Sequence, residues 1–131
     1  MRVSQAIARK TVQQYFDSFN QGQFVTTAAL FAQTGQLIVP FEGATVGPGD
    51  IQTYLEKKAK NMSATPQQWS FSPRENDQWQ VEVSGKVKTT VFQVNVSWLF
   101  FINDSSQLIS ARVKLIASPT ELLNLRAVAS T

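Results

Sequence analysis

The first half of the chain has hydrophobic residues at helical spacing. A helix is predicted to end at 20–22, where glycine favours a helix stop. A second helix is expected over 27–32, followed by a strand over 36–39. The Gly- and Pro-containing segment 40–49 is typical of a loop, and Pro48 is expected to begin a third helix. The residues that share one face of the first helix are Val12, Tyr15, Phe16 and Phe19.

The second half alternates between hydrophobic and polar residues. Runs over 79–88, 92–102 and 109–117 each place apolar side chains on one face and polar side chains on the other. This period of two is typical of an antiparallel sheet that is covered on one side. Polar turns are expected at 75–77 and 103–106. In the last run the inward residues are predicted to be Ile109, Ala111, Val113, Leu115 and Ala117.

The C-terminal segment has the signals of one more helix. Ser118 is placed to cap it, Pro119 suits its first turn, and Glu121 completes the capping pattern. Helices followed by a meander of strands predict an α+β fold. We expect one domain over 1–131, in which a curved, mostly antiparallel sheet wraps onto the N-terminal helices as a cone with an apolar interior.

The composition narrows the chemistry. The sequence contains no cysteine and no histidine, which excludes disulfides, thiolate nucleophiles and imidazole bases, and no metal site is predicted. The net charge of +3 comes from basic residues spread along the chain, so no nucleic-acid partner is predicted. No apolar run has the length of a membrane span, and the N-terminus lacks a secretory signal. A soluble, cytoplasmic protein is therefore expected.

The interior of the cone is the candidate site. Two of its expected lining residues carry hydrogen-bond donors, the Tyr15 phenol and the Trp98 indole. Backbone carbonyls satisfy most such donors, whereas two donors aimed at one ligand oxygen would form a carbonyl-recognition site. The sequence leaves both alternatives open. The other predicted lining residues are Phe16, Phe19, Phe100, Val113 and Leu115.

Acid–base catalysis on this fold would require an inward carboxylate. Asp17 is predicted to point outward from its helix, and Glu82 lies on the outer face of its strand. Glu42 is the acid placed to reach the pocket mouth, so no catalytic residue is predicted and the protein is not expected to be an enzyme. An isomerase- or dehydratase-like enzyme remains the alternative, and a hydrogen bond from Tyr15 to Glu42 would favour it. A pocket filled by its own side chains would instead favour a ligand-free interaction module.

Several segments resemble a known family. The sequences at 15–20, 85–89, 95–98 and 117–125 occur in the same order as in the C-terminal domain of the orange carotenoid proteins. The resemblance covers roughly 11–126, and the segment ASPTELLNL is its most specific part. The chain is therefore similar to free-standing homologs of that domain, which are cyanobacterial carotenoid carriers of the nuclear transport factor 2-like superfamily. That superfamily has the cone-shaped α+β fold.

The resemblance implies a protein that binds and transfers a ketocarotenoid such as canthaxanthin, echinenone or 3'-hydroxyechinenone. Tyr15 and Trp98 match the family's hydrogen-bond donors to the keto oxygen, and Val113 and Leu115 match apolar tunnel positions. Implied partners are a second copy in a pigment-loaded homodimer, membranes such as the thylakoid that supply pigment, and helical N-terminal-domain carotenoid proteins that receive it. Singlet-oxygen quenching and photoprotection are also implied. The terminal helix matches an element that gates the tunnel, and its residues are Pro119, Leu122, Leu123 and Leu125.

Two positions depart from the family pattern. Val91 stands in the segment where many relatives have tryptophan, and Ala59 stands where many have cysteine. Without cysteine, an intermolecular disulfide cannot regulate this chain.

Overall fold

The first helix forms as its periodicity predicts. The computed structural model describes residues 3–116, and helix α1 covers Gln5–Asn20. Ser4 caps it, since the Ile7 backbone N–H donates to Ser4 Oγ over 3.2 Å. The chain leaves the helix through Gly22, whose φ of +71° is a conformation that glycine adopts easily. The predicted inward face of α1 is confirmed, with Tyr15 and Phe16 buried.

The second helix begins earlier than predicted. Helix α2 covers Phe24–Ala29, not 27–32. Its buried face is formed by Phe24, Thr27 and Ala28, which have helical spacing. Phe31 is not helical, because it begins strand β1 and is buried in the core.

Two strand predictions near Pro40 also need correction. Strand β1 covers Phe31–Val39 and so begins five residues before the predicted start at 36. Its pairing is irregular between Phe31 and Gln36, which breaks the alternation that would have revealed it. Within the predicted loop, Gly43–Val46 forms a short strand, β2, antiparallel to β1. No residue of β2 is buried, so no hydrophobic pattern marks it. Helix α3, Pro48–Lys58, begins at the predicted proline.

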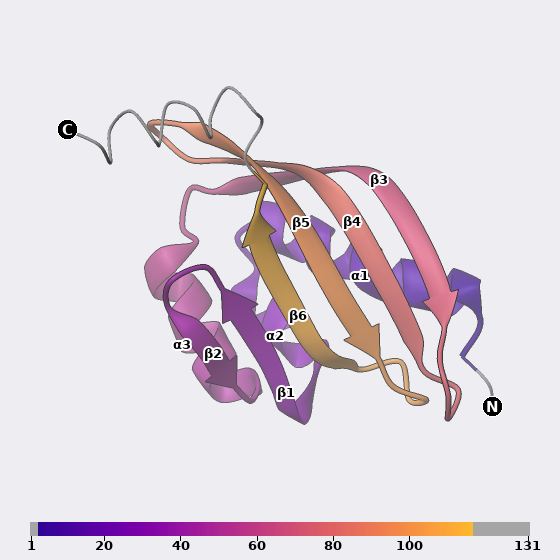
Figure 1. Cartoon of the computed structure of the whole chain (residues 1–131). Helices are drawn as coiled ribbons and strands as arrows, with labels where there is room; N and C mark the ends of the chain where they lie inside the picture. Colours follow the sequence, from indigo (N-terminus) through magenta and orange to yellow (C-terminus); the bar gives the residue numbers. More distant parts are fainter. Residues whose placement is uncertain (1–2, 117–131) are drawn as a thin grey trace.

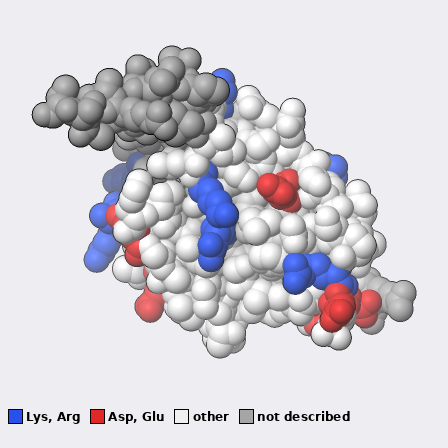
Figure 2. All heavy atoms as spheres, viewed as in Figure 1, with Lys and Arg blue, Asp and Glu red and all other residues white. Residues whose placement is uncertain are grey.

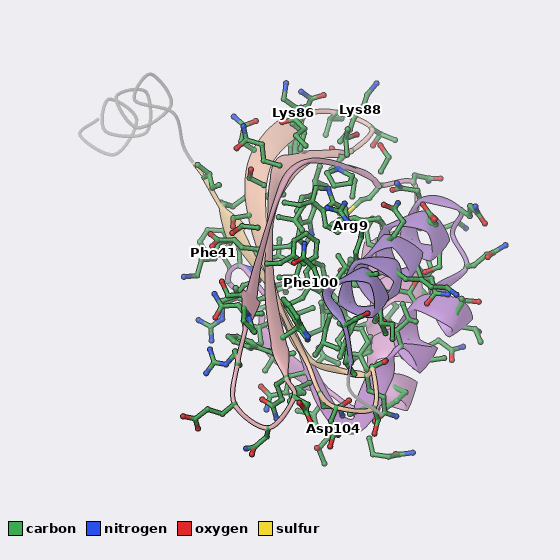
Figure 3. The ribbon with its side chains drawn as sticks, turned by 90° about the vertical axis from the view of Figure 1, so that its right-hand side faces the viewer. Arg9, Phe41, Lys86, Lys88, Phe100 and Asp104 are labelled. Atoms are coloured by element: carbon green, nitrogen blue, oxygen red, sulfur yellow. The ribbon has the colours of Figure 1, made fainter. Side chains whose placement is uncertain are left out.

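Six strands form a single curved sheet (Figure 1). Strands β3 (Ser63–Pro73), β4 (Trp79–Lys88), β5 (Gln93–Ile102) and β6 (Leu108–Leu115) follow one another as antiparallel neighbours. The strand order is β2-β1-β6-β5-β4-β3, and β1 lies parallel to β6. The helices lie against one face of this mixed sheet (Figure 3). The predicted α+β cone is confirmed.

Strand β6 contains a register shift that the sequence does not reveal. Ile102 pairs with Leu108, and Phe101 pairs with Ser110, so Ile109 has no partner of its own. Leu108 is therefore the buried residue, and the prediction that Ile109 points inward is wrong. From Ala111 onward the predicted alternation resumes, although Leu115 is 49% exposed near the end of the strand.

The core lies between α1 and the concave face of the sheet. Phe100 is fully buried there, between the sheet and the helices (Figure 3). The predicted turns at 75–77 and 103–106 are confirmed, with left-handed residues at Asn76, Asp77 and Ser106. The predicted terminal helix, with Pro119, Leu122, Leu123 and Leu125, lies outside the described residues.

Candidate ligand-binding site

A cavity of about 300 Å³ lies between α1, α3 and the sheet. Its volume is at the lower end of the ligand pockets found in proteins, which hold about 300–1,000 Å³. Its lining is mostly apolar and includes residues of β1, β4, β5 and β6. The interior of the cone is therefore not filled by its own side chains. Five of the predicted lining residues do line it: Tyr15, Phe19, Trp98, Val113 and Leu115.

Phe16 and Phe100 lie behind this lining. Both are core residues, 1% and 0% exposed, and neither borders the cavity. The Phe16 ring meets Trp98 edge-on with centroids 4.8 Å apart, and the Phe100 ring meets Tyr15 at 5.1 Å. Edge-to-face contacts of this kind fix the orientation of both rings. The two phenylalanines thus support the site from the core.

The two predicted donors, Tyr15 and Trp98, have no hydrogen-bond partner among the described residues. Each side chain belongs to a residue that is 2% exposed and lines the cavity. In the described part of the chain no fully enclosed side-chain nitrogen or oxygen lacks a partner. It follows that Tyr15 Oη and Trp98 Nε1 keep contact with accessible space. Within residues 3–116, no backbone carbonyl accepts a hydrogen bond from either group, so the first of the two alternatives does not apply.

The environment of Tyr15 keeps its hydroxyl protonated. Burial raises the pKa of Tyr15 far above its usual value, and the nearby Tyr54 adds to the rise. A neutral phenol donates one hydrogen bond, so Tyr15 remains a donor at physiological pH. Trp98 can only donate. We call the part of the cavity wall formed by these two buried residues, Tyr15 and Trp98, its inner end. It offers two donors and matches a ligand that brings an acceptor.

A polar cluster at the rim was only partly predicted. Tyr54 donates a short hydrogen bond to Glu42, and Lys58 Nζ lies 3.5 Å from Glu42 Oε1. All three line the cavity. The hydrogen bond from Tyr54, with help from Lys58, lowers the pKa of Glu42, so the carboxylate is ionised at neutral pH. Burial and the bond to Glu42 raise the pKa of Tyr54.

The sequence predicted that Glu42 could reach the mouth of the pocket, but it predicted no role there for Tyr54 or Lys58. Lys58 stands close to Lys57 and Lys60 in the sequence, and such charge runs usually belong to a solvated helix face. Glu42 bonds Tyr54 and not Tyr15, so the contact that would favour an enzyme does not occur within the described residues.

The two departures from the family pattern lie in different surroundings. Ala59 lines the cavity and is 4% exposed, so its methyl group forms part of the interior wall. Val91 is 81% exposed in the β4–β5 connection and does not border the cavity. Its neighbour Phe92 does line it and is 59% exposed. The aromatic contribution from this connection thus comes from Phe92.

Other site classes find little support in residues 3–116. They contain no group of three acidic, histidine or cysteine side chains able to hold a metal ion. None of their helices is long and apolar enough to cross a membrane. On the face shown in Figure 2, lysine and arginine side chains are scattered among uncharged residues.

Comparison with known proteins defines the class. Residues 7–109 match the model of the nuclear transport factor 2 (NTF2) domain, and the chain belongs to this family. Its sequence is 32% identical to the orange carotenoid-binding protein of Limnospira maxima and 31% identical to that of Synechocystis, in each case over 92% of the chain. The solved structure of the Anabaena orange carotenoid protein binding canthaxanthin matches with a TM-score of 0.79 and 31% identity over 87% of the chain.

These matches fall on one part of longer proteins. The chain spans 39% of the two curated relatives and 38% of the Anabaena structure, and the matching part is their C-terminal region. Both curated relatives are orange carotenoid-binding proteins. The resemblance found in the sequence is thereby confirmed.

Proposed function

We propose that this protein binds a ketocarotenoid and transfers it between a membrane and helical carotenoid-binding proteins. The observation that carries the proposal is a pair of donors, Tyr15 and Trp98, that line a mostly apolar cavity and have no hydrogen-bond partner among the described residues. Both donor atoms keep contact with accessible space, and a ligand that displaces water from them without accepting their hydrogen bonds would pay roughly 1–3 kcal/mol for each, which a carbonyl oxygen avoids. The polyene itself would enter because water is released from apolar surface.

The size of the cavity favours binding by one end. About 300 Å³ accommodates a terminal ring but not a long polyene with rings at both ends. The rest of the pigment would leave through the mouth, past Phe92 and Leu115, which are 59% and 49% exposed. A second copy could take the other ring, so we infer a homodimer around one pigment. Apolar residues at the mouth would also suit pigment uptake at a membrane such as the thylakoid.

The bound state would have a distinct colour. Two donors on the keto oxygen withdraw electron density from the conjugated chain and should move its absorption to longer wavelength. Canthaxanthin, echinenone and 3'-hydroxyechinenone all carry the required carbonyl. Quenching of singlet oxygen is a property of the polyene, and the protein's share would be to hold it in a fixed register.

The test is expression in a canthaxanthin-producing host, followed by an absorption spectrum of the purified protein. A coloured complex with red-shifted absorption is expected, and a colourless protein would count against the proposal. Trp98→Phe should shift the spectrum to the blue and weaken binding about tenfold, by loss of one hydrogen bond. Mixing the complex with a colourless helical carotenoid domain tests transfer, since pigment should move to the acceptor.

Trp79→Phe is the matched control. The Trp79 indole donates to the Val3 carbonyl over 2.8 Å and does not border the cavity. This substitution also removes an indole N–H, so it should leave the spectrum unchanged. Equal spectral shifts in the two variants would remove Trp98 from the site.

A further inference from the structure

The rim of the cavity places two opposite charges beside an apolar interior. Glu42 lies in the turn between β1 and β2, and Lys58 lies in the last turn of α3, which runs next to β2 (Figure 1). Their side chains are 43% and 57% exposed and approach within 3.5 Å. Tyr54 donates to the same carboxylate. The pair therefore adds no net charge at the point where a ligand enters.

An unpaired lysine at this position would change what the cavity attracts. An apolar cavity with a cation at its mouth suits a long chain with a carboxylate head, such as a fatty acid. Glu42 neutralises that cation, so the mouth offers a carboxylate no net attraction. A neutral keto polyene is affected by neither charge. Specificity often requires such an element that disfavours the wrong ligand as well as contacts that favour the right one.

We propose that Glu42, held by Tyr54 and Lys58, is a specificity-determining residue that excludes carboxylate-headed apolar ligands from the cavity. The inference rests on the proposed function, since it concerns ligands of the same cavity. Its physical basis is the interaction of unit charges at a partly exposed site, where repulsion within a few ångströms changes affinity about tenfold. The lowered pKa of Glu42 agrees with a carboxylate that remains charged at neutral pH.

Oleate and oleyl alcohol test the inference, because the two probes share one chain and differ in the charge of the head group. Calorimetric titration gives the ratio of their dissociation constants for each variant. The wild-type protein should favour the alcohol. Glu42→Gln should move the ratio about tenfold toward oleate, because Lys58 loses its partner. Lys58→Met should move it in the opposite direction, because Glu42 then stands unneutralised.

Two control variants separate charge at the rim from charge elsewhere. Glu56→Gln removes a carboxylate from α3, the helix that carries Lys58, but Glu56 accepts a hydrogen bond from Gln52 over 2.8 Å and does not border this cavity. Its ratio should equal that of the wild type. In the double variant Glu42→Gln/Lys58→Met the mouth again has no net charge, so the ratio of dissociation constants should return most of the way to the wild-type value. High salt should reduce the effect of both single substitutions.

An unchanged ratio in Glu42→Gln, or shifts of the same sign in the two single variants, would overturn the inference. So would a failure of both lipids to bind every variant. These outcomes are distinct from failure of the proposed function, which is judged by uptake of canthaxanthin. If the protein takes up no carotenoid but the two single substitutions move the lipid ratio in opposite directions, the inference about charge holds and the proposed function is wrong.

Discussion

The two ends of the cavity differ in how their polar groups are satisfied. At the inner end, Tyr15 and Trp98 are each 2% exposed and have no hydrogen-bond partner within residues 3–116. At the rim, Glu42, Tyr54 and Lys58 are more exposed and bond one another. Water satisfies an exposed group freely, whereas a nearly buried group has few water contacts and depends more on the protein or a ligand. The polar groups with protein partners are therefore the exposed ones at the rim, which water could also satisfy.

This contrast assigns different tasks to the two ends. The inner end holds two donors that no described residue uses and that a ligand can reach, and the Tyr15 and Trp98 rings are fixed by Phe100 and Phe16 from the core. At the rim, Glu42, Tyr54 and Lys58 already bond one another, so they can act on a ligand mainly through their charges. Substitutions at the inner end should therefore alter pigment binding, and substitutions at the rim should alter selection among ligands.

The largest effect is expected from the core support of the inner end. Phe100→Ala removes a fully buried ring that contacts Tyr15 at 5.1 Å between centroids, and it should lower the free energy of unfolding by about 3–5 kcal/mol. Urea unfolding measures the change. Phe41→Ala, at a residue that is 96% exposed, should change stability by less than about 0.5 kcal/mol. Similar losses in both variants would contradict the assignment of Phe100 to the core.

Tyr15→Phe should separate binding from stability. The hydroxyl has no partner among the described residues, so its removal should leave the free energy of unfolding unchanged within about 0.5 kcal/mol, or raise it. Canthaxanthin affinity should fall about tenfold, with a blue shift, because one bond to the keto oxygen is lost. Unfolding of the pigment-free protein and absorption of the complex measure the two effects. A large loss of stability with unchanged colour would mean that the hydroxyl has a structural role.

The sequence predicted the parts of the fold that follow one period without interruption. Helix α1 and strands β4 and β5 have such patterns, and they place Tyr15 and Trp98 on the inward side. The predictions failed where pairing between distant segments sets the structure. The irregularity near Gly35 and the extra residue Ile109 depend on how β1, β5 and β6 align.

The same limit applies to the candidate site. Periodicity could identify Tyr15 and Trp98 as inward donors, but only the positions of neighbouring carbonyls decide whether such donors are satisfied. The bond between Glu42 and Tyr54 joins a turn to a helix 12 residues away. No local pattern encodes that contact. Whether a donor has a hydrogen-bond partner is thus harder to predict from sequence than which face of its element it lies on.

Both ends should affect stability in alkaline solution, because each holds a tyrosine whose pKa is raised. Burial raises the pKa of Tyr15 in the folded state above the unfolded value of about 10. The folded protein then keeps a proton that the unfolded chain loses, so this contribution is fully present below about pH 10 and is lost as the pH rises further. Between the unfolded and the folded pKa, stability falls by at most about 1.4 kcal/mol per pH unit.

Urea unfolding between about pH 9 and 11 measures this dependence. Tyr15→Phe should flatten it, whereas Glu42→Gln should leave the share of Tyr15 intact and reduce only the share of Tyr54, whose pKa the Glu42 carboxylate helps to raise. A profile that Tyr15→Phe does not alter would mean that Tyr15 ionises as readily when folded as when unfolded.

The smallest effect is expected at the rim. Tyr54→Phe removes the hydrogen bond to Glu42 but keeps the ring in the cavity wall and the ion pair with Lys58. Because Glu42 can turn to water, the free energy of unfolding should fall by only about 0.5–1 kcal/mol. The absorption of bound canthaxanthin should not change, since the Tyr54 hydroxyl already donates its hydrogen to Glu42. A blue shift as large as that of Tyr15→Phe would show that Tyr54 contacts the keto oxygen, and the division between a binding end and a selecting end would then be wrong.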